Sequence, residues 1–368
     1  MFDRLKPHNT YLVGCYGMLN SGDDALMCSA HWGARVHLNS EHILTSSASA
    51  TQVDRYTIIP AFPKSKFRGH RRLLHYLNAW QSEKVIFGGG SGIHSEKDIN
   101  FKNHLVKLAG GKRSRCIGIG IEEFESVRAE RACAKFLNNC GFVGIRDKYS
   151  FEVASSIAPN ANIHLTFDLA PTMLKHGIWD IQPIRRKGIM MNFCQLPHDG
   201  LNLENRQQLL ERVNTAIAII VNSWEILKES IYLLDFNGHP IYGDFHVHER
   251  IINGLPEHID INHISYDPNP YRVLQRIASF KAVVAMRLHA AIMAFMVNTP
   301  CLPITYHKKC IGWCNQIGVP TEYRFEAHEL TTDGIPNQLV KGITAGFFKS
   351  DLSIDNAIGA AMSNWSYQ

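Results

Sequence analysis

Short apolar segments alternate with helical patterns along most of the chain, and this alternation constrains the fold more than any other feature. A repeated strand–helix order predicts a parallel, doubly wound sheet. In the first half, strands are expected near residues 11–15, 42–45, 57–59, 85–87, 116–119, 142–145 and 164–167, and helices over 24–35, 73–80, 130–138 and 149–154.

A break at residues 176–187 divides this pattern into two series. It contains Pro183 and the basic run from Arg185 to Lys187. Beyond it, strands are expected at 188–193, 231–236, 282–286 and 301–305, and helices at 203–228, at 271–280 and after His289. Because 368 residues are many for one core, we predict an N-terminal domain over 1–180, a linker at about 176–187 and a C-terminal domain over 188–368.

Composition excludes several classes of protein. Hydrophobic residues make up 45% of the chain and charged residues 19%, which is typical of a globular protein. The formal net charge of +5 is modest for this length and gives no support to nucleic-acid binding. The densest basic stretch runs from Lys64 to Arg72; it is either a solvated face or a peripheral contact with anionic lipid or an anionic acceptor.

The cysteines and the apolar runs bear on the compartment. Nine scattered cysteines do not form a secreted disulfide framework, and no ligand spacing for a metal is found, so reduced thiols and no metal are expected. No signal-peptide core and no apolar run of about 18 residues is present. We therefore expect a cytoplasmic protein, peripheral to a membrane if its acceptor is lipid-linked.

Two cationic side chains follow the apolar run 282–286 at the point where a strand should give way to a helix. Ligands bind at such strand ends in open α/β sheets. In extended backbone, Arg287 and His289 would share one face. A guanidinium captures a carboxylate or phosphate, and an imidazole exchanges a proton near neutral pH, so the pair fits an anionic substrate. The alternative is that His289 is one of 19 ordinary histidines.

A glycine-rich turn follows the first expected strand, with Gly14, Gly17 and Gly22 before the acidic pair Asp23 and Asp24. This spacing is not that of a dinucleotide-binding turn. The two carboxylates at a helix N-terminus also disfavour a phosphate there. They suit sugar hydroxyls instead, or removal of a proton from one. A plain N-cap and tight turn is the alternative.

Together these segments resemble the polysaccharide pyruvyltransferase family, whose members begin with G-x-x-G-x-x-N-x-G-D and end with R-x-H-x-x-x-x-A, Pro and Tyr-x-Lys. The matching residues are Gly14, Gly17, Asn20, Gly22 and Asp23, then Arg287, His289, Ala294, Pro300, Tyr306 and Lys308. Segments that look like internal landmarks of the family lie between them, at 87–92, 118–120, 144–150 and 168–170. The loop 93–98 does not clearly match, which leaves substrate contacts there open.

The resemblance implies an α/β fold of two Rossmann-like domains that face a cleft, as in GT-B glycosyltransferases. It also implies transfer of a pyruvyl group from phosphoenolpyruvate, the donor, to two hydroxyls of a sugar or lipid-linked oligosaccharide, with release of phosphate and no cofactor. Arg287, Lys308 and Lys309 would bind the donor, and His289 would be the acid. On the acceptor side, Asp24 would act in catalysis, and Asn20, Asp23, Gly89 and Gly90 would bind the sugar.

Other functions and roles remain open on the residues alone. A nucleotide-sugar-dependent glycosyltransferase would share the architecture, and a silent sugar-binding protein would share the fold without turnover. Lys308 and Lys309 could begin a solvated helix. The residues of the run from Gly88 to Gly92 could only turn the chain, and Arg146 and Asp147 fit an ion pair or a helix cap better than catalysis.

Overall fold

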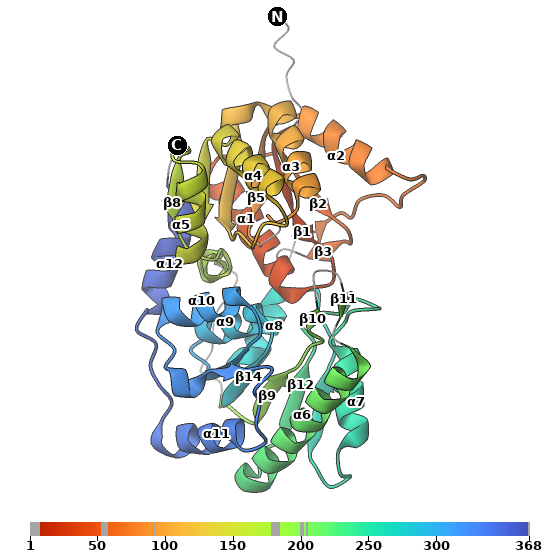
Figure 1. Cartoon of the computed structure of the whole chain (residues 1–368), viewed down its shortest axis with the longest axis vertical. Helices are drawn as coiled ribbons and strands as arrows, with labels where there is room; N and C mark the ends of the chain where they lie inside the picture. Colours follow the sequence, from red (N-terminus) through yellow and green to blue (C-terminus); the bar gives the residue numbers. More distant parts are fainter. Residues whose placement is uncertain are drawn as a thin grey trace, which may run out of the picture. The chain divides into compact units, whose positions relative to one another are not determined.

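The computed structural model describes residues 8–52, 58–90, 93–177, 185–198, 202–203 and 205–366. The chain forms two compact units (Figure 1). The first comprises Met1–Met18, Asp23–Ile178 and Asp355–Gln368, and the second comprises Leu19–Gly22 and Trp179–Ile354. The expected domains differ from these units at two places, because residues 19–22 belong to the second unit and the C-terminal 14 residues belong to the first.

The first unit is built on a six-stranded sheet in the order β2-β1-β5-β6-β7-β8, in which all neighbours are parallel. Strand β2 lies on one side of β1, and β5 and the later strands lie on its other side. The strand order therefore reverses between β1 and β5. The strands are β1 His8–Tyr16, β2 Ile43–Ser47, β5 Ser82–Gly88, β6 Arg115–Ile119, β7 Phe142–Ile145 and β8 Ile163–Leu165. The expected strand at 57–59 corresponds to β4 Ile58–Ile59, which pairs with β3 Thr51–Gln52 in a separate antiparallel hairpin, and residue 57 lies outside the described residues.

Six helices accompany this sheet in the described part of the chain. They are α1 Ser21–His37, α2 His70–Trp80, α3 Glu96–Ala109, α4 Val127–Asn139, α5 Lys148–Ile157 and α12 Ile354–Met362. Side-chain N-caps explain three of the starts: Ser95 accepts from Asp98 N, Ser126 from Ala129 N and Asp147 from Ser150 N. Helix α3 was missed by the sequence analysis, although Ser95 followed by acidic residues is a start signal.

The C-terminal segment is bound to the first unit through Asn364, which is fully buried. Its Oδ1 accepts hydrogen bonds from Gly118 N (2.8 Å) and Thr166 Oγ1 (3.0 Å), and its Nδ2 donates to Phe167 O. The Trp365 ring packs directly against Gly33 of α1. In Figure 1, α12 (blue) accordingly lies beside α5 and β8 of the same unit. Apolar periodicity could not predict this attachment of the C-terminal segment, because the bonded residues are 197 to 246 positions apart in sequence.

The second unit has its own six-stranded sheet in the order β13-β12-β9-β14-β15-β16, again with parallel neighbours. Numbered from its first strand, the order is 3-2-1-4-5-6, which is that of dinucleotide-binding Rossmann folds. Its reversal lies between β9 and β14. The strands are β9 Ile189–Asn192, β12 Ile231–Leu234, β13 Ile261–Ile264, β14 Ala282–Ala285, β15 Cys301–Thr305 and β16 Phe325–Glu326.

The helices of the second unit alternate with the strands, as predicted in general. They are α6 Arg206–Leu227, α7 Phe245–Gly254, α8 Pro270–Ala278, α9 Leu288–Met296, α10 Lys308–Ile317 and α11 Gly334–Ala345, and a hairpin of β10 Pro197–His198 and β11 Asn202–Leu203 precedes α6. Helices α7 and α11 and the strands β13 and β16 were not among the predicted elements. Asn205 opens α6 with a capping box, and Asn269 caps α8 before a proline at its first position. The predicted fold class, α/β with two Rossmann-like units, is confirmed. None of the helices described is long and apolar enough to cross a membrane.

Candidate functional site

The reversal of strand order in the second sheet puts Asn192 and Arg287 next to each other. Asn192 ends β9 and Arg287 follows β14, and these two strands are parallel neighbours. The Arg287 amide donates to Asn192 Oδ1 at 3.0 Å. Ligands of open α/β sheets bind beyond the carboxyl ends of the strands at such a reversal. The sequence prediction that Arg287 stands at a strand end is therefore confirmed.

The expected backbone geometry of the Arg287–His289 pair is wrong. Strand β14 ends at Ala285, Arg287 is the N-cap residue of α9 with φ −73° and ψ 130°, and His289 already lies in the first helical turn. The alternation of side chains along a strand thus does not apply to the two residues. The helix begins earlier than expected because Leu288 and the buried run from Ala290 to Met296 pack as a helix against β14 and β15.

Arg287 is held by a buried carboxylate that the sequence analysis did not identify. Its Nε and Nη2 donate to Asp244 Oδ1 at 3.0 and 2.7 Å. The Asp244 side chain is fully buried, and that of Arg287 is 22% exposed. Burial has the largest single effect and lowers the pKa of Arg287, but the charge and hydrogen bond of Asp244, together with the effects of Cys194 and Tyr306, outweigh it, so the net shift is well upward. Arg287 therefore stays protonated with a fixed orientation.

His289 faces the backbone of the glycine-rich segment near the N-terminus. A Cβ on Gly22 would lie 2.3 Å from His289 Nδ1 and 2.5 Å from its Cγ, so only glycine lets the imidazole pack so closely. Gly22 N in turn donates to Asn20 Oδ1 at 2.9 Å. Asn20, predicted to serve the acceptor from the N-terminal domain, thus belongs to the same compact unit as Arg287 and His289.

Residues 19–22 are bound to this unit by backbone hydrogen bonds to the loop that follows β12. Ser21 N donates to Phe236 O (2.9 Å), Gly238 N donates to Leu19 O (2.8 Å), and Asn20 forms an antiparallel bridge with Asn237. Asn20 and Gly22 of the first predicted motif therefore lie in the same unit as Arg287 and His289 of the second, which are more than 260 residues away in sequence.

The end of β15 contributes the remaining predicted donor-binding residues. Lys308 and Lys309 begin α10, where His307 Nδ1 accepts from Lys309 N; Lys308 is exposed and Lys309 half-buried. Because β15 is the parallel neighbour of β14, α9 and α10 begin at the same edge of the sheet. Helix N-termini carry partial positive charge, so this edge favours anions even beyond its cationic side chains.

Two neutral groups lie among these charges. Burial raises the pKa of the Cys194 thiol to about 11, despite the lowering effect of Arg287. Burial, reinforced by Cys194, likewise raises the pKa of the Tyr306 hydroxyl. Both groups are therefore protonated near neutral pH, and neither is suited to act as a nucleophile or base.

The acidic pair lies in the first turn of α1, in the first unit from Asp23 onward. Asp24 is fully buried and Asp23 is half-buried. Burial and the nearby charge of Asp23 raise the pKa of Tyr16, whose hydroxyl donates to Gly88 O at 2.8 Å. This contact joins the ends of β1 and β5, where the strand order of the first sheet reverses.

Glycines 88–90 are explained in part by packing. A Cβ on Gly88 would meet the Tyr16 hydroxyl at 2.4 Å, and Gly89, with φ +72°, packs against Leu26. Gly90 has φ +82° with open space where a Cβ would stand. The positive φ angles of the turn thus require glycine at positions 89 and 90. Of the three glycines, Gly90 is the one with open space where a side chain would stand. Ser91 and Gly92 lie outside the described residues.

Arg146 and Asp147 have the structural roles favoured by the sequence analysis. Arg146 Nη1 lies 3.3 Å from Asp168 Oδ2, and both side chains are buried. Asp147 caps α5. This ion pair stands beside Gly120, where a Cβ would come within 3.1 Å of the guanidinium.

Asp235, His248 and His263 form a cluster whose ligand atoms lie within 4.8 Å of one another, a spacing that the sequence analysis did not find. The hydrogen bonds argue against a metal. His248 Nε2 accepts from Phe193 N, so Nδ1 carries the proton and donates to Asp235 Oδ1 at 2.6 Å. A metal on Nδ1 would leave both ring nitrogens without a proton, so the cluster is better explained as a buried carboxylate bonded by two histidines.

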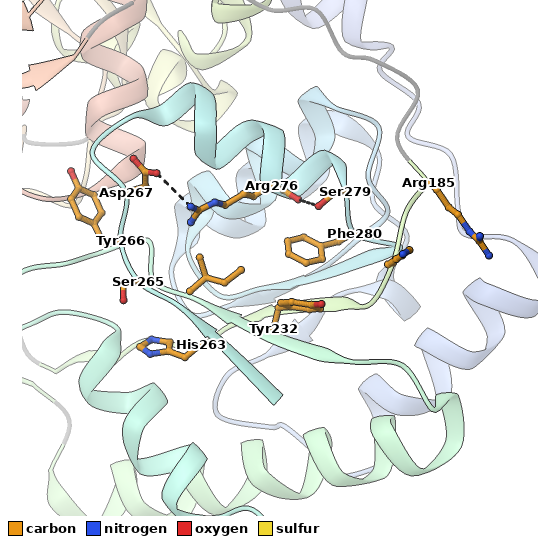
Figure 2. A pocket seen from close by; sticks show the side chains of 11 residues that line it. Arg185, Tyr232, His263, Ser265, Tyr266, Asp267, Arg276, Ser279 and Phe280 are labelled. Atoms are coloured by element: carbon orange, nitrogen blue, oxygen red, sulfur yellow. Dashed lines mark hydrogen bonds and ion pairs between the residues drawn. The ribbon is translucent and has the colours of Figure 1, made fainter. Parts of the chain in front are cut away.

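A surface hollow of about 700 Å³ lies between β12, β13 and α8, with Tyr232 and Phe280 packed 5.0 Å apart between ring centres (Figure 2). Figure 2 shows Arg276 directed toward Asp267 at its upper rim. Asp267 is already paired with Arg272 at 2.8 Å. Among the described residues lining it, none is a predicted site residue, so this hollow is distinct from the edge that carries Arg287 and His289.

The chain resembles known proteins in both sequence and structure. The family model described as polysaccharide pyruvyl transferase matches residues 20–308. The chain belongs to this family. The match includes the first motif from Asn20 onward and the second motif as far as Lys308, so the resemblance stated from the residues is confirmed. No curated protein sequence matches the chain.

Solved structures of sugar-nucleotide enzymes share the fold of this family member. A UDP complex of MnaA from S. aureus superposes with a TM-score of 0.60 at 9% identity, covering 96% of this chain and 93% of that one. UDP-GlcNAc 2-epimerase from Neisseria meningitidis gives 0.57 at 10% identity and 96% of both chains. The trehalose-6-phosphate synthase OtsA gives 0.52 at 8% identity, covering 97% and 94%. At these identities the likeness shows the GT-B type of fold alone.

Proposed function

We propose that the protein transfers a pyruvyl group from phosphoenolpyruvate onto two hydroxyls of a sugar in a polysaccharide or its precursor, forming a cyclic ketal and releasing phosphate. The observation that carries the proposal is that residues from both motifs of the family lie at one cationic edge: Arg287 is fixed by Asp244, and His289 packs on Gly22. Membership of the pyruvyl transferase family supports the same reaction class.

The donor carries a carboxylate and a phosphate, so its site needs oriented donors and positive charge. Of the five N–H donors of a guanidinium, two of Arg287 are used by Asp244, which leaves the opposite edge for a bidentate contact with a carboxylate or phosphate. Asp244 compensates the charge of Arg287. The excess positive charge is therefore supplied by Lys308, Lys309 and the N-terminal ends of α9 and α10.

The proposed chemistry balances with an acid, a base and no external oxidant. His289 protonates the methylene carbon of phosphoenolpyruvate, and the positive charge that develops at the neighbouring carbon is captured by one sugar hydroxyl, which loses its proton. The bond from that carbon to the phosphate oxygen then breaks, and the second hydroxyl closes the ring as it too loses a proton. Asp23 or Asp24, the carboxylates predicted for the acceptor side, would accept a hydroxyl proton. Such proton transfers contribute about 10²- to 10⁴-fold in rate.

The test is to incubate the protein with phosphoenolpyruvate and a panel of free, nucleotide-linked and lipid-linked sugars. The proposal expects phosphate release that depends on one acceptor, with a ketal of the acceptor in equal amount. Phosphate release without a ketal, or no reaction across the panel, would count against it. Arg287→Ala protein, which lacks the proposed donor contact, is the negative control.

A nucleotide-sugar-dependent glycosyltransferase is the second candidate, favoured by the fold shared with a trehalose-6-phosphate synthase and with UDP-sugar enzymes. A set of cations at helix starts would also accept a nucleoside diphosphate. The same panel distinguishes the two, because this candidate requires release of a nucleoside diphosphate from a nucleotide sugar and no consumption of phosphoenolpyruvate.

A further inference from the structure

Asp244 makes no capping bond to its own helix, although it stands at the N-cap position of α7. Aspartate is among the preferred N-cap residues, and such a cap contributes about 1 kcal/mol. Here the side chain instead turns away from α7 and is fully buried at the edge of the sheet. Its carboxylate is therefore committed to other partners.

Those partners come from three different parts of the site. Oδ1 accepts both hydrogen bonds of Arg287. Oδ2 accepts from Asn192 Nδ2 (3.1 Å), Phe236 N (3.0 Å) and Asn237 N (3.1 Å). A carboxylate that accepts five such bonds has both oxygens satisfied and one orientation. Asp244 thus joins the end of β9, the loop after β12 and the start of α9.

The loop after β12 extends this network to His289. Phe236 O and the Asn237 bridge hold residues 20 and 21, and Gly22 then packs on the imidazole. The Asp244 carboxylate therefore fixes the Arg287 guanidinium directly. Through the loop after β12, it also supports the segment that ends in Gly22, on which the His289 imidazole packs.

From this geometry we infer that Asp244 is the positioning residue of the donor site: it holds Arg287 with one edge of the guanidinium turned toward the ligand, and does not itself touch the substrate. The inference rests on the proposed function for the identity of the ligand. It differs from a purely electrostatic role, because a buried negative charge by itself weakens anion binding.

That difference fixes the sign of the test. Asp244→Asn keeps the shape and removes the charge. If Asp244 positions Arg287, the variant should bind phosphoenolpyruvate at least about tenfold more weakly, because a carboxylate and a phosphate at fixed separation need an oriented fork. Binding of inorganic phosphate, which any nearby cation can satisfy, should be unchanged or stronger. The matched control is Asp267→Asn, which breaks the Asp267–Arg272 pair in the same unit and should alter neither affinity.

Calorimetric titration of the full chain measures both affinities, and steady-state rates should show a larger effect on the KM for phosphoenolpyruvate than on kcat. Equal or tighter phosphoenolpyruvate binding by Asp244→Asn would overturn the inference, as would equal losses for both anions.

A second measurement is made on the unmodified protein, so it depends neither on enzymatic activity nor on the stability of Asp244→Asn. The Arg287 Nε–H resonance in ¹⁵N spectra, identified by its absence in Arg287→Lys, should be slow to exchange in the unmodified protein, and rapid exchange there would overturn the inference. If the unmodified protein bound no phosphoenolpyruvate while this resonance was protected, the proposed function would fail and the Asp244–Arg287 bond would stand.

Discussion

Replacing Arg287 by alanine should cost both stability and donor binding, and the structure separates the two effects. The change removes both hydrogen bonds to Asp244 Oδ1 and leaves a fully buried carboxylate without its counter-charge. Breaking a buried ion pair costs about 3–5 kcal/mol. The Arg287 side chain is 22% exposed, and Oδ2 of Asp244 keeps three hydrogen-bond donors. We therefore expect a loss in the free energy of unfolding of about 2–3 kcal/mol, at or below the bottom of that range.

The loss of stability should be recovered in part by a second change. For a unit of this size, about 2–3 kcal/mol corresponds to roughly 4–12 °C in Tm. Asp244→Asn combined with Arg287→Ala removes the unpaired charge, so the double variant should regain about half of the lost free energy of unfolding, as measured by urea denaturation.

Donor affinity should behave differently. Loss of a charge-assisted contact at a desolvated site costs about 2–5 kcal/mol, or about 30-fold or more in Kd. Calorimetry with phosphoenolpyruvate should therefore show this loss in both the single and the double variant. Full donor affinity in Arg287→Ala would refute the assignment of Arg287, and equal stability losses in the two variants would refute its coupling to Asp244.

Three further changes test other parts of the site and fold. His289→Ala should lower kcat by about 10²- to 10⁴-fold while donor Kd changes little, since a proton donor acts in the transition state; a donor Kd that rises as much as kcat falls would make it a binding residue. Gly22→Ala, whose new Cβ would meet His289 Nδ1 at 2.3 Å, should lower kcat, whereas Gly312→Ala in α10, with no atom within 4 Å of its Cβ, should not; equal rates in both would show that the close packing is dispensable. Burial lowers the pKa of His75 to about 4, so the unfolded chain takes up this proton first and stability should fall as pH drops from about 6.5 toward 4. Urea midpoints across that range should fall less steeply in His75→Phe, and identical slopes would exclude this source of acid sensitivity.

The sequence predicted the parts of the fold that depend on local pattern. Strand β15 was placed at its observed bounds, 301–305, and Arg287 was placed at the end of a strand, because an apolar run followed by a cationic pair is a local signal. Helix α9 was expected only after His289, since Arg-Leu-His reads equally well as extended chain.

The contacts that build the site could not be predicted in this way. Asp244 is 43 residues from Arg287 and lies in a segment without apolar periodicity, so nothing local identifies it as the partner of that guanidinium. The attachment of residues 19–22 to the loop after β12 likewise depends on backbone hydrogen bonds formed only in the folded chain. The aspartates, by contrast, were placed correctly in a first helical turn, although full burial of Asp24 has no signal in the sequence.

The central claim, carbon protonation of phosphoenolpyruvate followed by ketal formation, is tested most directly by running the reaction in deuterated water and analysing the acceptor product. Protonation of the methylene carbon adds one solvent hydrogen to it. The account predicts a pyruvyl ketal whose methyl group carries one deuterium, formed in equal amount with phosphate and absent with His289→Ala. A product without that deuterium, or a glycoside formed from a nucleotide sugar in its place, would contradict it.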